Sequence, residues 1–184
     1  YVDQNQVYGS NVIVGQFLRE SDGDRGVGSR ILMGPEDPSA PGFHLMSTLR
    51  ELLDHHRAAE TVFEGPGLGA GKTLMEYYPT LWTETGGYNM AVVRQLAGDF
   101  MGSSHALLLD ANPMISPLDH YIGGDGRANE NFTLTSMHTI WARAQCAPQH
   151  TGTLALFAQL LVRLRRPFRD RIQVAAQHID SRRR

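Results

Sequence analysis

The sequence predicts a mainly α-helical fold with long connecting loops. The strongest observation is a leucine repeat over residues 45–53 with the spacing of a helix that has one apolar face. Further helices are expected over 88–100, about 129–144 and near 154–165. Apolar residues recur at helical spacing in 88–100 and 154–165, and residues 129–144 contain a helix motif described below. No region shows a series of alternating polar and apolar residues, which would indicate a sheet.

The helix expected over 45–53 has a well-defined apolar face. Its apolar positions fall at i, i+4, i+7 and i+8, and charged residues occupy the opposite side. The apolar residues are Leu45, Leu49, Leu52 and Leu53, with Met46 beside them, and the charged ones are Arg50, Glu51, Asp54 and Arg57. A loop of glycine and proline at 65–71 ends this helical region.

The remaining elements follow in chain order. Residues 20–41 are rich in Gly, Asp, Ser and Pro, which predicts a loop. The helix over 88–100 places Met90, Val93, Leu96 and Ala97 on one face. Residues 112–126 contain two prolines and three glycines and predict a long loop. Loops of this length in a compact domain usually carry function.

The composition excludes several classes of protein. The chain has 184 residues, 41% of them hydrophobic and 20% charged, as in an ordinary globular domain. A net charge of −2 argues against a dedicated nucleic-acid binder. The single cysteine, Cys146, excludes an internal disulfide framework, and no apolar run is long enough to span a membrane. No signal peptide is visible, which leaves the compartment, including a secreted location, open.

The charge changes abruptly near Arg143. Residues 1–142 contain 8 basic and 17 acidic side chains, whereas residues 143–184 contain 9 basic and 2 acidic ones. Such a change marks a domain boundary, a basic tail or a change of origin. We therefore divide the chain into residues 1–143 and a basic, arginine-rich tail, residues 144–184.

A glycine-rich segment ending at Lys72 is similar to a nucleotide-binding P-loop. The motif requires a glycine five residues before Gly71, but Pro66 stands there with a fixed φ and no N–H to donate. The short segment before it, 61–63, is expected to extend a helix rather than form the buried strand that the motif needs. A plain glycine-rich connection is the better interpretation, and a nucleotide-binding protein remains an alternative.

Three segments in register carry a specific resemblance. Residues 134–143 read Leu-Thr-Ser-Met-His-Thr-Ile-Trp-Ala-Arg, residues 124–130 read Gly-Asp-Gly-Arg-Ala-Asn-Glu, and residues 2–10 read Val-Asp-Gln-Asn-Gln-Val-Tyr-Gly-Ser. These resemble, respectively, the hallmark helix, the distal Gly-Asp-x-Arg-x-x-Glu segment and the calcium loop of the animal-type haem peroxidases. The resemblance covers residues 1–143. It implies a partial haem peroxidase domain of helical fold that uses hydrogen peroxide to oxidise a reducing substrate.

The resemblance implies a catalytic role for Arg127 as the distal arginine. Cleavage of bound peroxide leaves negative charge on the departing oxygen, and a permanent cation with fixed donors stabilises it. Arg127 and Glu130 would both contact the haem, and Glu130 matches the residue that in several members forms an ester with a haem methyl. From the residues alone, Arg127 and Glu130 would form an i,i+3 surface ion pair at the start of a helix, where Glu130 also favours the helix dipole.

The resemblance further implies a partial calcium site formed by Asp3, Asn5 and the carbonyl of Tyr1. Oxygen ligands at such spacing suit calcium. Asp-x-Asn by itself is better explained by a polar turn, and the Tyr-Gly-Ser that follows favours calcium. The family's distal and proximal histidines have no counterpart among the 184 residues, and the resemblance gives His138 no catalytic role. We therefore expect this chain alone to be inactive. We also expect it to be weakly folded, because its helices would lack packing partners.

Two interpretations of residues 144–184 remain open. The family continues its hallmark helix with Glu-His-Asn, whereas this chain continues Ala-Gln-Cys-Ala-Pro-Gln-His, so a shifted reading frame would account for the tail. The alternative is a genuine amphipathic helix with one basic face and one apolar face. In that case the chain would be a non-catalytic helical interaction module.

Overall fold

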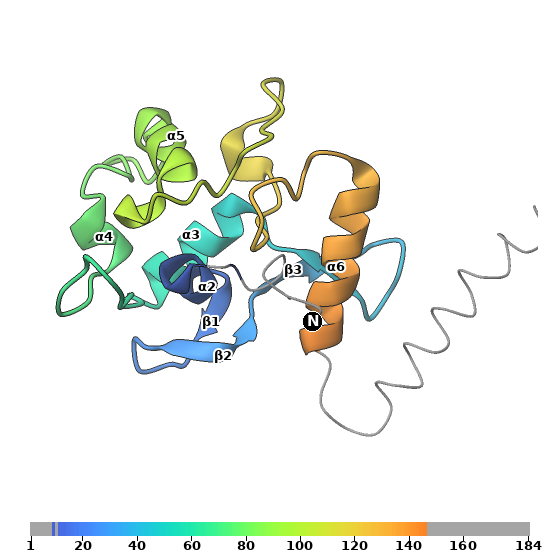
Figure 1. The fold of residues 1–184 in the computed structure, drawn as a ribbon, viewed down its shortest axis with the longest axis horizontal. Helices are drawn as coiled ribbons and strands as arrows, with labels where there is room; N and C mark the ends of the chain where they lie inside the picture. Colours follow the sequence, from blue (N-terminus) through green and yellow to red (C-terminus); the bar gives the residue numbers. More distant parts are fainter. Residues whose placement is uncertain (1–8, 10, 147–184) are drawn as a thin grey trace, which may run out of the picture. The chain divides into compact units, whose positions relative to one another are not determined.

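The computed structural model describes residue 9 and residues 11–146. They belong to one compact unit, Tyr1–Cys146, and the second unit, Ala147–Arg184, lies outside the described residues. The helix expected near 154–165 and both interpretations of the tail therefore lie outside them too. Within the described part, helices and short strands are mixed (Figure 1). The prediction of a mainly α-helical fold is wrong, because four strands pair into two antiparallel sheets.

The helices are spread along the whole described segment. They are α2 (Val12–Phe17), α3 (Leu49–Ala58), α4 (Leu74–Tyr77), α5 (Met90–Gly98) and α6 (Phe132–Cys146). Two short 3₁₀ helices, η1 (Phe100–Gly102) and η2 (Pro117–Asp119), lie in the connections. The strands all fall between α2 and α3, and they are β1 (Arg19–Ser21), β2 (Val27–Ile31), β3 (Met33–Glu36) and β4 (His44–Met46).

The four strands form two consecutive hairpins. β1 pairs with β2 in a register that places Arg19 opposite Ile31, and β3 pairs with β4 so that Met33 lies opposite Met46. Asp22 closes the first hairpin, because its carboxylate accepts the backbone N–H groups of Asp24 and Gly26, both at 2.9 Å. The prediction that residues 20–41 form a loop is therefore wrong for half of them, which lie in β1, β2 and β3.

A glycine makes the second hairpin possible. A Cβ added to Gly34 would lie 2.6 Å from the carbonyl oxygen of Met46, which is closer than any real side chain comes to backbone. The strands can approach each other only because no side chain stands at this position.

The main core forms around the apolar face of α3. Leu49, Leu52 and Leu53 are fully buried, which confirms the apolar face predicted from their spacing. The helix itself begins later than expected, at Leu49, because Thr48 and Glu51 form a capping box there. The preceding residues His44–Met46 form β4 instead. The prediction that this face lacks packing partners is wrong.

Aromatic rings from three parts of the chain fill the centre of this core. Phe17 of α2 lies 4.4 Å from Phe100 and 6.2 Å from Phe63, measured between ring centroids. All three rings are fully buried. Phe63 also forms an isolated β-bridge with Lys72, so residues 61–63 do not extend the helix as we expected.

Helix α6 packs separately, against the strands. Its buried residue Ala142 joins a second cluster with Ile31 of β2, Met46 of β4 and Ala128. Figure 1 shows α6 beside the hairpins and away from α4 and α5. The helices predicted over 88–100 and 129–144 are confirmed as α5 and α6, and α6 continues past Arg143 to Cys146.

A buried histidine ties α2 to α3. His56 is 1% exposed; its Nε2–H donates to the carbonyl of Phe17 at 2.8 Å, and its Nδ1 accepts from the hydroxyl of Thr61 at 3.0 Å. Burial lowers the pKa of His56 from 6.5 to about 4, and the nearby His55 acts in the same direction against the hydrogen bond to Phe17. The imidazole is therefore neutral at physiological pH.

The burial of His56 predicts a loss of stability in acid. Between pH 6.5 and pH 4 the unfolded chain binds a proton at this histidine and the folded chain does not, so stability falls as the pH falls. The loss amounts to about 3 kcal/mol at pH 4, because each pKa unit corresponds to about 1.4 kcal/mol. His56→Gln can keep both hydrogen bonds without titrating. Denaturant unfolding at several pH values should therefore show a shallower decline for this variant, and equal slopes would contradict the assignment.

Candidate functional site

The candidate site is the turn between η2 and α6 that carries Arg127. The guanidinium of Arg127 makes two hydrogen bonds with the carboxylate of Asp125, from Nε at 3.1 Å and from Nη2 at 2.8 Å. The backbone N–H of Arg127 donates to the same carboxylate at 3.0 Å. Asp125 is thus both the cap of the turn and the partner of the arginine. The Arg127 side chain is 58% exposed, compared with 23% for Asp125.

The prediction that Arg127 forms an ion pair with Glu130 is wrong. Glu130 is exposed, and Arg127 is bonded to Asp125 instead. An aspartate two residues before an arginine can accept the backbone N–H and the side chain of that arginine together. The sequence contains this signal in Gly-Asp-Gly-Arg, whereas the prediction of a pair with Glu130 rested on helical spacing alone.

The two charged groups shift each other's pKa. The hydrogen bond from Arg127 is the main cause that lowers the pKa of Asp125, and the charge of His138 adds a smaller effect in the same direction. In return, the hydrogen bond to Asp125 raises the pKa of Arg127, and Glu130 and Asp110 act in the same direction more weakly. Both groups are therefore charged across the whole physiological range.

Backbone contacts on both sides hold the turn in place. Leu109 donates its N–H to the carbonyl of Gly126 at 2.9 Å, and a Cβ at Gly126 would lie 2.8 Å from the carbonyl oxygen of Ala106. On the other side, the amide of Asn129 bonds with both backbone groups of Tyr121, at 2.7 and 3.1 Å. The position of Arg127 is consequently fixed by contacts of its turn with two earlier segments, residues 106–109 and Tyr121.

Helix α6 begins directly after this turn. Asn131 accepts the N–H of Leu134 at 2.9 Å, and the hydroxyl of Thr135 donates to the carbonyl of Ala128 at 2.7 Å. One turn further on, His138 is 3% exposed and donates from Nδ1 to the carbonyl of Leu134 at 2.9 Å. Its Nε2 is buried and has no hydrogen-bond partner among the described residues.

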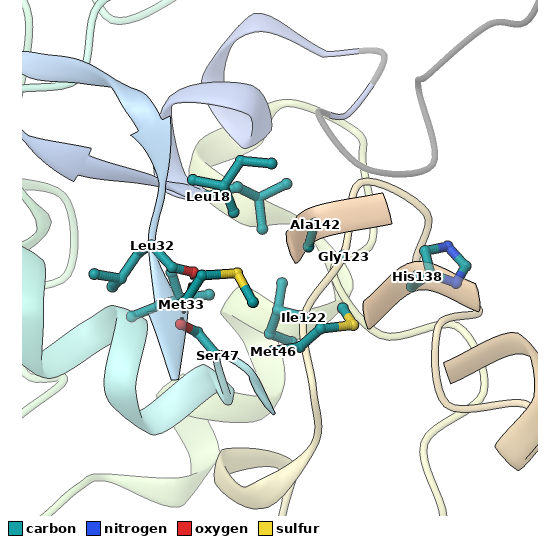
Figure 2. A pocket seen from close by; sticks show the side chains of 11 residues that line it. Leu18, Leu32, Met33, Met46, Ser47, Ile122, Gly123, His138 and Ala142 are labelled. Carbon is teal, nitrogen blue, oxygen red and sulfur yellow. Dashed lines mark hydrogen bonds between the residues drawn. The ribbon is translucent and has the colours of Figure 1, made fainter. Parts of the chain in front are cut away.

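An apolar pocket lies beside α6 and not at Arg127. It contains about 310 Å³ of empty space, part of it open to solvent. Figure 2 shows side chains around it that include Met33 and Met46 of the second hairpin and Ile122 of the loop after η2. His138 and Ala142 form the α6 side. Neither Arg127 nor Glu130 lines the pocket.

The described residues do not form a haem site by themselves. Arg127 and Glu130 are exposed on a surface turn, and the pocket beside α6 encloses only about 10 Å³, room for about one water molecule. Of the three buried histidines in the described part of the chain, His56 and His120 use both ring nitrogens in hydrogen bonds, whereas His138, which lines the small pocket, leaves Nε2 without a hydrogen-bond partner. We therefore derive no step of peroxide chemistry from this geometry.

The predicted calcium ligands Tyr1, Asp3 and Asn5 lie outside the described residues. Within the part that the structure does describe, no group of three or more His, Cys, Asp or Glu side chains could hold a metal ion. The adjacent histidines of α3 contact different partners: Nε2 of His55 accepts the N–H of Ser21, whereas His56 lies in the core.

The glycine-rich segment before Lys72 has the geometry of a closed loop. Its two ends meet in the antiparallel bridge between Phe63 and Lys72, and the ammonium of Lys72 lies 5.5 Å from the centre of the Tyr77 ring. The following helix, α4, has only four residues, and Thr73 and Glu76 cap it reciprocally. This is not the strand–loop–helix arrangement in which a P-loop binds phosphate.

Comparisons with known proteins give no match: none to a family model, none to a curated protein and none to a solved structure. Over residues 9 and 11–146, no helix is long and apolar enough to cross a membrane.

The pair formed by Asp125 and Arg127 can be tested by titration. The structure predicts that the pKa of Asp125 lies below its usual value and rises in Arg127→Gln, because that substitution removes the charged donor. Carbon NMR of the side-chain carboxyl group measures this directly. Glu130→Gln serves as the control and should leave the pKa of Asp125 nearly unchanged. An unaltered pKa in Arg127→Gln would show that the two side chains are not paired in solution.

Proposed function

We propose that this chain is part of a haem-dependent peroxidase that oxidises a reducing substrate with hydrogen peroxide. The observation that supports the proposal best is the orientation of Arg127 by Asp125 immediately before α6. Arg127 therefore lies in the turn just before the helix. The resemblance of residues 124–130 and 134–143 to the haem peroxidases leads us to expect this arrangement.

Arg127 is the proposed catalytic residue. Its two hydrogen bonds with Asp125 fix the plane of the guanidinium, and its exposure leaves the group open to a ligand. A preoriented cation of this kind stabilises an oxygen on which negative charge develops. When bound, the haem would supply the redox chemistry, and the role of the protein would be orientation and charge stabilisation.

Glu130 is the proposed second contact to the haem. It lies three residues after Arg127 on the same turn, and its side chain is exposed. The proposed calcium ligands Tyr1, Asp3 and Asn5 complete the resemblance at the other end of the chain.

A non-catalytic interaction module is the second candidate. The exposure of several large apolar side chains favours it: Phe132 is 85% exposed, Met114 is 89% exposed, and Met137 is also on the surface. Such side chains occur at binding surfaces for other proteins. This candidate requires no haem.

If the chain belongs to a longer gene product that supplies the family's two histidines, the role of Arg127 can be tested in that product. Arg127→Ala should slow the reaction with peroxide by about 10² to 10³ fold, the usual effect of removing one preoriented donor. Haem binding should persist, which the Soret absorption band reports. Arg94→Ala, at an exposed arginine of α5, is the matched control and should react at the wild-type rate. Equal rates in all three proteins would remove Arg127 from the catalytic assignment.

The chain of 184 residues should itself show no peroxide turnover above that of free haem. In the haem peroxidases that the chain resembles, iron is held by an imidazole and peroxide is deprotonated by a nearby base, and the chain has no counterpart of either family histidine. Haem titration measures haem binding, and the oxidation of a phenol by peroxide then measures turnover. Haem binding without turnover would support the peroxidase proposal over the interaction module. Turnover well above free haem would contradict the prediction.

A further inference from the structure

Two aromatic rings lie against charged residues of α3. Trp82 and Tyr88 form an antiparallel bridge at the ends of a turn, and their ring centroids lie 6.1 Å apart. Trp82 is 8% exposed, and Tyr88 is half-buried. Arg50, Asp54 and Arg57 follow one another at helical spacing, which places them on one side of α3. The contacts described next bring these three charged groups to the two rings.

The hydroxyl of Tyr88 has a base as its hydrogen-bond partner. It donates to the carboxylate of Asp54, so the phenolic proton faces a group that can take it up directly. Burial is the main cause that raises the pKa of Tyr88, and the hydrogen bond and the charge of Asp54 raise it further, against weaker effects of Trp82 and Arg50. Tyr88 therefore keeps its proton at rest and releases it only after its ring has lost an electron, since an oxidised phenol is a strong acid.

A guanidinium lies over each of the two rings. The central carbon of the Arg57 guanidinium is 4.9 Å from the ring centre of Trp82, and that of Arg50 is 5.7 Å from the ring centre of Tyr88. A cation over an aromatic face is attracted by the electrons of the ring and repels any positive charge that forms there. Oxidation of either ring is therefore favoured only if a proton leaves with the electron, because the radical that remains is then neutral.

Of these two rings, Tyr88 is the one whose proton has an acceptor. The indole Nε1 of Trp82 is buried and has no hydrogen-bond partner among the described residues. An oxidised Trp82 would thus keep its proton and its positive charge next to Arg57. An oxidised Tyr88 can pass its proton to Asp54. An electron vacancy on Trp82 should therefore move to Tyr88.

Two other tyrosines of the described chain lack this arrangement. The hydroxyl of Tyr78 donates to the backbone carbonyl of Asp99 at 3.3 Å, and a backbone carbonyl does not take up a proton. Tyr77 is half-buried, with the ammonium of Lys72 5.5 Å from its ring centre. Its hydroxyl makes no hydrogen bond to a carboxylate among the described residues. Tyr77 therefore matches Tyr88 in burial and in its cation, but not in having a base.

We propose that Tyr88 is a redox-active tyrosine that gives one electron to an oxidant while Asp54 takes its proton. The O–H bond of the phenol breaks, the one-electron oxidant is reduced, and the products are a neutral phenoxyl radical and a protonated Asp54. A one-electron donor from solution returns the electron, and Asp54 returns the proton. Tyr88 is only half-buried, which leaves it within reach of such molecules. The proposal does not depend on the peroxidase function.

Flash oxidation of the full chain tests the proposal without haem. Tris(bipyridine)ruthenium, excited by light and quenched by a cobalt(III) ammine complex, supplies the one-electron oxidant, and EPR of frozen samples detects the radical. The wild type should give a tyrosyl spectrum that narrows when its tyrosines are deuterated. Tyr88→Phe should lose most of this signal, and Tyr77→Phe, the matched control, should keep the wild-type yield. A wild-type yield in Tyr88→Phe, or a radical that stays on tryptophan in the wild type, would overturn the proposal.

The role of Asp54 is tested by the rate at which the radical forms, followed by transient absorption. In Asp54→Asn the amide oxygen can still accept the hydrogen bond from Tyr88, but the amide does not take up the proton. The rate should fall by about 10² fold, the lower end of what a positioned base contributes. It should also increase with buffer concentration in this variant, because the buffer must then accept the proton, and not in the wild type. Equal rates in the two proteins, or the same dependence on buffer, would overturn the assignment of Asp54 and with it the proposal.

Discussion

Burial of the apolar face of α3 is the constraint on which the rest of the described structure depends. This face contacts a core to which α2, α5 and the loops between them contribute, and both hairpins lie in the connection from α2 to α3. His56 adds to this packing, because its hydrogen bond to the carbonyl of Phe17 joins the end of α2 to α3. A polar group inside such a core is tolerated because both of its ring nitrogens have partners.

Helix α6 depends on this core only indirectly. It rests on β2, β3 and β4, which are short strands placed by the connection between α2 and α3. Its buried side is small, and it contains one charged residue, Arg143, in 15 residues. Phe132 and Met137 remain exposed on it. A helix with so little charge on its surface is typical of one that packs on more than one side.

The longer helices α3, α5 and α6 could be predicted from the sequence, whereas the short helices α2 and α4 and the strands could not. The faces of α3 and α5 follow from apolar residues at helical spacing, a signal that is long enough to stand on its own. β1 and β4 have only three residues each, too few for an alternating pattern to be recognised. The second hairpin depends on a tertiary feature, the close approach at Gly34, whereas the first depends on a local turn at Asp22 that does not by itself predict the strands beside it.

The candidate site shows the same division between local and tertiary information. Motifs identify Arg127 as the residue of interest, but its partner follows from the conformation of one turn. The helical spacing that suggested Glu130 did not apply, because α6 begins only at Phe132. The pairing of Tyr121 with Asn129, which holds the turn, joins residues on either side of it and leaves no sequence pattern.

The bond to Asp125 determines what Arg127 can do chemically. A guanidinium has five N–H donors, and Asp125 occupies two of them, so three remain for a ligand. The pairing fixes the direction of these donors and removes part of the entropy that a free arginine would lose on binding. It also offsets the positive charge, because the carboxylate lies beside it. A neutral pair of this kind attracts a distant anion only weakly, yet still places donors beside an oxygen atom that approaches closely. Arg127 is therefore better suited to stabilise charge that develops during a reaction than to capture a substrate that is already charged.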